Sequence, residues 1–374
     1  MIYFDNAATT MPSNEALCQA KKFNNEMFFN PSSLYFGGLN CAKEIKCAKE
    51  SVLKNLGTTN HEVIFTSCGS ESDNMAIFCA VKRGVFVTDK GEHSAVYKCF
   101  LELKNRGFDV EFIDLNKDGT VNTDKLFEFV KSNRVDFVSI MHGNNETGGI
   151  NDINLIAKTI KSINKNIIFH SDGVQAYGKI SYKLCNEIDL YSISAHKINA
   201  LKGVGALIKR KGLNVKPLIF GGGQENGLRS GTENVFGIKV FEYAGQQKYL
   251  NINQNFNKVL EIKNYIINNL DKQLFKIISG ENSSPYILSI SAVGLRGEVV
   301  MHSIENEVIV GNGSACSSKN RFSRVIEACG YSSDVLDGVI RLSFCQDNTL
   351  DEAMFVTDLL NKTAKKLKGI INKQ

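Results

Sequence analysis

The sequence predicts an α/β fold, in which helices wrap a large, mostly parallel sheet, together with a smaller α+β unit. Seven short β-rich runs alternate with helical patterns from about residue 62 to residue 207, which is typical of a parallel sheet covered by helices. The runs are EVIFTS, GVFVTD, DVEFIDL, RVDFVSIM, NIIFHSD, DLYSISA and VGALIKR. Helical spacing of apolar residues, as in INLIAKTIKSI, separates several of them.

The pattern changes after residue 234, and this change predicts the smaller unit. A long helical stretch is expected from about Val235 to Leu270, because its interior has few glycines and no proline. Three further β-rich runs follow, SPYILSISAVG, EVIVGNGSAC and GVIRLSFC, with helical patterns between them. We expect a large domain over residues 12–250 and a small domain formed by residues 1–11 and 251–374.

Composition and charge exclude several classes of protein. The formal charge of +5 is spread over 374 residues, which is too dilute to indicate nucleic acid as the main partner. The N-terminal residues lack the basic and apolar regions of a secretion signal, and no run of about 18 apolar residues occurs. We therefore expect a cytoplasmic protein without membrane segments.

Ten cysteines occur at irregular spacings without a CxxC pair. Neither a zinc site nor a secreted disulfide framework is indicated, so we expect no metal. Most of these cysteines fit the role of small buried apolar residues. Cys316 differs, because it lies in VGNGSACSSKN, where Gly, Ser and Asn favour a loop. A loop suits a thiol that must move and react.

Polar residues follow the predicted strands, where open α/β sheets bind their ligands. Gly69 and Ser70 come after EVIFTS and open a helix, whose free N–H groups suit a phosphate. Taken alone, Ser70 or Ser72 also fits an ordinary helix N-cap. His93 follows the next run and opens another helix, and an isolated histidine is often structural.

The next two strand ends carry amides and acids. Asn144, Asn145 and Glu146 follow RVDFVSIM, and asparagine there also fits simple turn chemistry. Asp172 follows NIIFHS, with Gln175 three places later, and a lone aspartate there also fits an N-cap.

A lysine completes the series of strand-end residues. Ser194, His196 and Lys197 end the run DLYSIS, just before a glycine-containing turn. A phosphate site, an acid, an aromatic ring, amides and a lysine, each after a strand, are the parts needed to hold pyridoxal phosphate. Lys197 would supply the amine that bonds to its aldehyde, and Asp172 would keep its pyridine nitrogen protonated. The chain is thus predicted to be a pyridoxal-phosphate enzyme.

At this point the chain resembles the cysteine desulfurases, which are pyridoxal-phosphate enzymes of the class V aminotransferase group. The stretches that carry the resemblance extend from residue 3 to about residue 344. They are YFDNAATT, ESDN, EHSAV, SIMHGNNETG, DGVQAYGK, SAHKI, GGGQENGLRSGTEN, GSACSS and IRLSF. The resemblance implies the transferase fold type I, with a seven-stranded sheet in the large domain and the reactive cysteine loop in the small one.

The resemblance also implies a role for each matching residue. Lys197 matches the lysine bonded to the cofactor, and His93 the imidazole that stacks on its ring. Asp172 matches the partner of the ring nitrogen, and Asn145 and Gln175 match amides near the ring hydroxyl. The residues that match phosphate ligands are Gly69, Ser70, Ser194 and His196. Thr232 matches a phosphate ligand donated by a second subunit, which implies a homodimer with shared sites. Arg341 matches the residue that binds the substrate carboxylate, and Asn145 and Asn30 lie near the substrate in relatives.

Cys316 matches the nucleophile of these enzymes. L-cysteine would be the substrate, alanine the product, and Cys316 would carry the sulfur as a persulfide. The spacing around GSACSS resembles the branch with a long cysteine loop, which implies an acceptor protein for iron–sulfur cluster assembly or tRNA thiolation. Two alternatives stay open: a scaffold or sulfur-relay subunit with little turnover, and a lyase acting on selenocysteine or cysteine sulfinate.

Three stretches depart from the family pattern. Asn199, Ala200 and Leu201 replace a Tyr-Gly-Pro turn after the lysine, so we expect that loop to differ. Tyr35 stands where relatives tend to carry histidine, and residues 345–346 are Cys-Gln in place of Gly-Arg.

Overall fold

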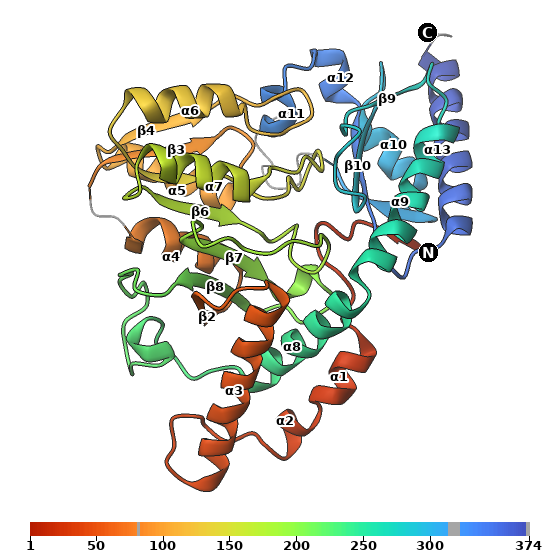
Figure 1. The fold of residues 1–374 in the computed structure, drawn as a ribbon. Coiled ribbons are helices and arrows are strands. Elements are labelled where there is room, and N and C mark those ends of the chain that lie inside the picture. Colours follow the sequence, from red (N-terminus) through yellow and green to blue (C-terminus); the bar gives the residue numbers. More distant parts are fainter. Residues whose placement is uncertain (81–82, 313–321, 372–374) are drawn as a thin grey trace.

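A computed structural model describes residues 1–80, 83–312 and 322–371 and contains the predicted sheet of seven strands (Figure 1). The strand order is β2-β8-β7-β6-β5-β3-β4. The strands are β2 (His61–Thr66), β3 (Val85–Asp89), β4 (Asp109–Ile113), β5 (Val135–Ser139), β6 (Ile168–Asp172), β7 (Leu190–Ser194) and β8 (Gly205–Arg210). The neighbouring pairs from β4 to β7 are parallel, and β8 is antiparallel to both β7 and β2. The prediction of a mostly parallel sheet is confirmed.

Helices cover both faces of this sheet. They are α1 (Asn14–Ala20), α2 (Lys22–Asn25), α3 (Phe36–Asn55), α4 (Gly69–Ala80), α5 (Ser94–Asn105), α6 (Thr123–Ser132), α7 (Ile153–Ile163) and α8 (Val235–Leu250), with short 3-10 turns at Ala195–Lys197 (η1) and Glu225–Gly227 (η2). One apolar cluster packs α3, α7 and α8 on one side of the sheet, and another packs α4 and α5 on the other. Every helix in the described part of the chain is too short or too polar to span a bilayer.

The long helical stretch predicted from about Val235 to Leu270 is helical but interrupted once. The structure has two helices here, α8 and then α9 (Ile252–Asn269), with a break at Asn251. Asn251 has φ −119° and ψ 21°, outside the helical region. An asparagine side chain competes for backbone hydrogen bonds, which makes this residue a natural point for the break.

The second unit lies beside the large sheet and has its own core (Figure 1). It contains the strands β1 (Ile2–Phe4), β9 (Phe275–Ile277), β10 (Ile287–Ala292), β11 (Val308–Val310) and β12 (Val339–Ser343) and the helices α9, α10 (Gly297–Ile304), α11 (Arg324–Ala328), α12 (Ser333–Asp337) and α13 (Leu350–Ile371). β1 pairs in parallel with β11, so the N-terminal residues belong to this unit. Phe4 joins its core beside Phe344, with ring centroids 5.0 Å apart. The domain bounds at residues 11/12 and 250/251 stay predictions.

A tight contact under the sheet allows a test of this packing. A Cβ on Gly173, directly after β6, would lie 1.8 Å from the ring of the fully buried Tyr191. We expect Gly173→Ala to lower the free energy of unfolding by about 1–3 kcal/mol, because the ring cannot move without disturbing the core. Urea unfolding followed by circular dichroism measures the change.

The matched control is Gly369→Ala, on α13, where an added Cβ meets no atom within 4 Å. That change should alter stability by no more than about 1 kcal/mol, in the stabilising direction, because alanine favours helix over glycine. Equal losses in the two variants would contradict the packing described at Gly173.

Candidate active site

A cavity of about 410 Å³ opens beyond the carboxyl ends of the large sheet's parallel strands. Its volume is within the usual range for a small-molecule site. Ten of the predicted residues line it: Gly69, Ser70, His93, Asn145, Asp172, Gln175, Ser194, His196, Lys197 and Arg341. The first nine come from the large sheet's strand ends, and Arg341 comes from β12 of the second unit. Residues far apart in the sequence thus meet in one place, while their individual roles stay predictions.

Three predicted residues are not in this cavity. Thr232 is exposed and lines a separate hollow of about 170 Å³. Asn30 is also exposed, and its side chain accepts a hydrogen bond from the Ser32 amide at 2.9 Å. Cys316 lies outside the described residues.

The start of α4 forms one end of the cavity. Gly69 is the first residue of the helix and Ser70 the second, so neither Ser70 nor Ser72 is its N-cap. The Ser194 hydroxyl is buried and has no hydrogen-bond partner among the described residues. A Cβ on Gly69 would lie 3.4 Å from the Ser194 Cβ, which places the two residues in contact. Free helix amides beside an unpaired hydroxyl form a suitable phosphate site.

The side chains of the two asparagines after β5 make different contacts. The Asn144 side-chain oxygen accepts hydrogen bonds from the amides of Glu146 and Thr147, both at 2.9 Å, so the turn alternative holds for this residue. Asn145 lines the cavity, and its side-chain oxygen is buried without a partner among the described residues. Asn145 is therefore available to a ligand, and Asn144 is not.

Burial shifts the pKa values of His93 and Asp172. It lowers the pKa of His93 to about 4, with further lowering by Lys197, so this imidazole is neutral near pH 7. His93 also caps α5, since its Nδ1 accepts from the Ala95 amide at 3.2 Å. Burial raises the pKa of Asp172 to about 6, against the lowering by the Val174 amide and by Lys197. Asp172 is thus mainly an anion near pH 7, although it is buried.

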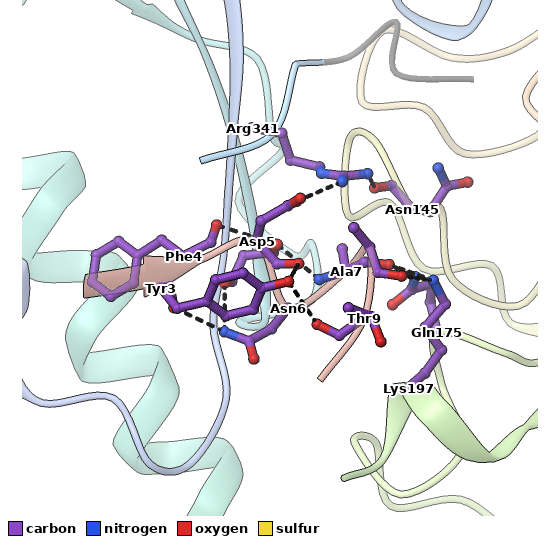
Figure 2. Close-up of polar contacts among 12 residues, drawn as sticks. Tyr3, Phe4, Asp5, Asn6, Ala7, Thr9, Asn145, Gln175, Lys197 and Arg341 are labelled. Atoms are coloured by element: carbon purple, nitrogen blue, oxygen red, sulfur yellow. Dashed lines mark hydrogen bonds and ion pairs between the residues drawn. The ribbon is translucent and has the colours of Figure 1, made fainter. Parts of the chain in front are cut away.

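An N-terminal strap, defined as residues 3–10, crosses the cavity from the second unit (Figure 2). The Lys197 ammonium donates to the carbonyl oxygens of Ala7 and Ala8, both at 2.7 Å. The Gln175 side-chain amide donates to the same Ala7 oxygen at 3.0 Å and accepts from Lys179 at 2.7 Å. The strap therefore fixes two of the predicted cofactor residues through backbone atoms.

The strap also holds Arg341 (Figure 2). The Asp5 carboxylate accepts from Arg341 Nη2 at 2.8 Å, and the Asn145 carbonyl accepts from Nη1 at 2.8 Å. Arg341 Nε is buried without a partner among the described residues. A side chain at Gly311 would meet both Asp5 and Arg341, at 2.6 and 2.9 Å, so the glycine leaves room for the guanidinium. An oriented arginine with a spare donor suits a carboxylate ligand.

Two of the residues that depart from the family pattern, Asn199 and Gln346, contact each other. Asn199 has φ 62°, a left-handed conformation that asparagine tolerates better than most residues, so the expected difference in this loop has a physical basis. Its side chain donates to the Met11 carbonyl at 2.8 Å. Gln346 donates to the Asn199 side-chain oxygen at 3.4 Å and accepts from Lys248. The two substitutions therefore form one polar network beside the site.

Several cavity residues were missed by the sequence analysis. Ala7 and Ala8 lie in a matching stretch, but alanine side chains give no chemical signal. Glu146 was named at a strand end but given no role; it lines the cavity, burial raises its pKa to about 7, and Ser323 donates a hydrogen bond to it. Asp73 could have been found, because it lies on the apolar face of α4, one turn before Ala76 and Ile77.

The donor set of the cavity fits pyridoxal phosphate. Three buried polar atoms of the predicted site residues in its lining have no hydrogen-bond partner among the described residues: Asn145 Oδ1, Ser194 Oγ and Arg341 Nε. Unpaired buried polar groups are costly, and a ligand with a phosphate, a polar ring and a carboxylate would satisfy such a set. A lysine, a buried acid and a neutral imidazole lie in the same cavity.

Comparisons with known proteins agree with this geometry. The family model described as aminotransferase class-V matches residues 2–355. The chain is 35% identical to the cysteine desulfurase IscS of Dictyoglomus turgidum, over 99% of this chain and 96% of the relative. A solved NifS-like protein superposes with a TM-score of 0.90 at 31% identity, covering 98% of this chain and 99% of its own. SspA, solved in complex with cysteine, gives a TM-score of 0.81 at 28% identity, covering 92% and 99%.

The anchoring of the strap can be tested at Asn6, which is 2% exposed. Its side-chain amide donates to the carbonyls of Tyr3 and Ser343, both at 3.1 Å. We expect Asn6→Ala to lower the free energy of unfolding by about 1–3 kcal/mol, because buried acceptors lose their donor. Asn24→Ala is the control, since Asn24 is exposed and bonds only its neighbour's side chain. Similar urea midpoints for both variants would mean that Asn6 does not anchor the strap.

Proposed function

Because the chain belongs to the aminotransferase class-V family, as its sequence predicts, we propose that it is a pyridoxal-phosphate-dependent cysteine desulfurase. Its fold is the predicted pyridoxal-phosphate transferase fold type I. The observation that carries the proposal is the single cavity in which Lys197, Asp172 and the unpaired polar atoms meet Arg341. The curated relatives that are named cysteine desulfurases, at about a third identity over nearly the whole chain, support the same activity.

The chain's residues would hold the cofactor at three points. Gly69 and Ser70 amides at the start of α4, with Ser194 and His196, bind the phosphate. The Asp172 carboxylate pairs with the ring nitrogen, and neutral His93 stacks on the ring without adding charge. Bound in this way, the cofactor supplies an electron sink for bonds at the substrate's α-carbon.

Lys197 holds and moves the proton of the reaction. Its ammonium is held by the Ala7 and Ala8 carbonyls, which places the amine at a fixed point in the cavity. The lysine must lose a proton before it can bond to an aldehyde or accept a proton from the substrate's α-carbon.

Arg341 and Cys316 act on the substrate itself. The Arg341 guanidinium, oriented by Asp5, binds the carboxylate of L-cysteine. The Cys316 thiolate attacks the substrate sulfur, so that a sulfur–sulfur bond forms and the substrate's carbon–sulfur bond breaks. The electron pair of the broken bond stays with carbon, which takes up a proton and leaves as alanine. Cys316 keeps the sulfur as a persulfide, and no external oxidant or reductant is needed.

A homodimer would complete the site. Thr232 is exposed and outside its own chain's cavity, as expected for a ligand given to a second subunit. An apolar patch also lies on the surface: Phe28, Leu34 and Phe36 are exposed by 68%, 88% and 80%. Such a patch suits an interface between two copies. Asn30 lies in this segment and would approach the substrate entrance of the second copy.

The persulfide requires a sulfur acceptor, for which a protein of iron–sulfur cluster assembly or tRNA thiolation is proposed. The relatives named IscS support the first of these. A cytoplasmic location also stays a prediction. A chain with little turnover, acting as scaffold or sulfur relay, would share the fold but release no alanine.

The role of Cys316 can be tested directly. Cys316→Ser should bind pyridoxal phosphate and L-cysteine normally but form alanine at least about 100-fold more slowly, because serine is a poor nucleophile toward sulfur. Cys18→Ser, at an exposed cysteine, is the control and should keep full activity. Alanine is quantified after incubation with L-cysteine. A wild-type rate in Cys316→Ser would exclude this cysteine as the sulfur carrier.

Shared sites can be tested by mixing two inactive chains. Lys197→Ala should abolish turnover, and Thr232→Ala should weaken pyridoxal phosphate binding by about tenfold or more through the lost phosphate contact. In a mixed dimer, one site receives Lys197 from one chain and Thr232 from the other. At limiting cofactor, refolded mixtures should therefore regain activity that neither variant has alone. Mixtures that stay inactive, despite forming mixed dimers, would contradict the shared site.

A further inference from the structure

A second buried acid lies beside Asp172. Asp73 of α4 is 1% exposed. One of its carboxylate oxygens, an oxygen of Asp172 and a ring nitrogen of His93 all lie within 4.8 Å of one another. Asp73 Oδ1 has no hydrogen-bond partner among the described residues. The role proposed above uses Asp172 and leaves Asp73 unexplained.

Among the residues that the structure describes, those around Asp73 include no cation that would balance a negative charge. The nearest imidazole, His170 of β6, lies 3.6 Å away and is neutral, because burial lowers its pKa to about 3. The titratable groups that face Asp73 from the preceding loop, α5 and β6 are thiols, acids and imidazoles: Cys68, Glu92, His93, Cys99, His170 and Asp172. Two carboxylates this close in a buried site cannot both be ionised at low cost.

The contacts of the two acids decide which one keeps the charge. Asp172 accepts the Val174 amide at 2.9 Å and feels the Lys197 ammonium, both of which favour its anion. Burial, and then the neighbouring Asp172, raise the pKa of Asp73 well above the ordinary value, and they outweigh the lowering by a hydrogen bond from Ser192. The proton therefore resides on Asp73.

A buried hydrogen-bonded chain continues from Asp73 to another acid. The Ser192 hydroxyl lies 3.0 Å from His170 Nε2, and His170 Nδ1 lies 2.8 Å from the Ser139 hydroxyl. The Ser139 hydroxyl is 3.4 Å from the Glu92 carboxyl, whose pKa burial also raises. With both acids protonated, every hydroxyl and the imidazole can donate in one direction, from Glu92 to Asp73. Such a chain fixes the position of Asp73, whereas burial and the neighbouring Asp172 keep it neutral.

We propose that Asp73 is a positioning residue, held as a neutral acid, that keeps the neighbouring Asp172 anionic for the pyridine nitrogen of the cofactor. This inference rests on the proposed function, because it assigns the ring nitrogen to Asp172. A metal ion at the same three side chains would need both acids ionised. It would also need a ring nitrogen with a free lone pair. His93 Nδ1 accepts from the Ala95 amide, so in the neutral imidazole Nε2 carries the proton and cannot bind a metal.

The first test compares two substitutions that differ in charge. Asp73→Asn keeps a neutral side chain of the same shape, so it should bind pyridoxal phosphate within about twofold of the wild type and show the same visible band over the pH range. Asp172→Asn removes the anion itself and should weaken binding by about tenfold or more. Cofactor affinity is measured by titration of absorbance. Weakening by about tenfold in Asp73→Asn would show that position 73 supplies a charge, and would overturn the proposal.

Asp73→Ala tests whether a side chain is needed at position 73 to position Asp172. It removes the acceptor of Ser192 and the neutral group beside Asp172, so cofactor affinity should fall by about tenfold relative to Asp73→Asn. Wild-type affinity in Asp73→Ala would exclude a positioning role. Stoichiometric metal in the purified protein would also contradict the proposal.

A second test needs no cofactor and stays informative if the chain binds none. A raised pKa in the folded state means that folded Asp73 keeps a proton which the unfolded chain loses above its ordinary value of 3.8. This contribution makes the wild type lose stability, relative to Asp73→Asn, as the pH rises from about 5 to about 8. Urea midpoints of both unloaded chains measure the gap. A gap that does not widen contradicts a neutral Asp73, whereas a wild type that binds no pyridoxal phosphate contradicts the proposed function instead.

Discussion

The shared direction of strands β3, β5, β6 and β7 is the constraint on which the site depends. Because their neighbouring pairs are parallel, all four carboxyl ends open toward one cavity. His93, Asn145, Asp172 and Lys197 follow these ends in turn, although they span more than a hundred positions of the sequence. The buried strands carry little chemistry themselves. They supply a rigid edge, and the loops after them supply the reactive groups.

The N-terminal strap adds what the sheet cannot supply. It begins in the second unit, where β1 pairs with β11, and ends against the loop after Lys197. On the way its Asp5 carboxylate orients Arg341 and its backbone carbonyls hold the lysine. Arg341 and Lys197, the proposed substrate and cofactor residues, therefore lie at a spacing set by a few residues of extended chain. A change in the strap would alter both ends of the substrate pocket together.

Much of this arrangement could be predicted from the sequence, for physical reasons. Strand runs of four to eight apolar residues gave the sheet, and the rule that ligands bind at strand ends gave the cavity residues, including Asp172 and Lys197. The break at Asn251 was not predicted because the apolar spacing continues across it. The contacts of Ala7 and Ala8 were not predicted because they use backbone carbonyls, which every residue type has. Asp73 was not singled out and Glu146 was named only as a strand-end acid, since the raised pKa of each comes mainly from burial, which depends on packing.

The measurement that tests the central claim most directly is the visible spectrum of the purified chain with pyridoxal phosphate, before and after L-cysteine, with alanine quantified in the same sample. A convergent site predicts a visible band that requires Lys197, is absent in Lys197→Ala, and changes on adding L-cysteine as alanine accumulates. A wild-type chain that stays colourless with the cofactor, or whose band persists in Lys197→Ala, would contradict the assignment of this cavity as a pyridoxal-phosphate site.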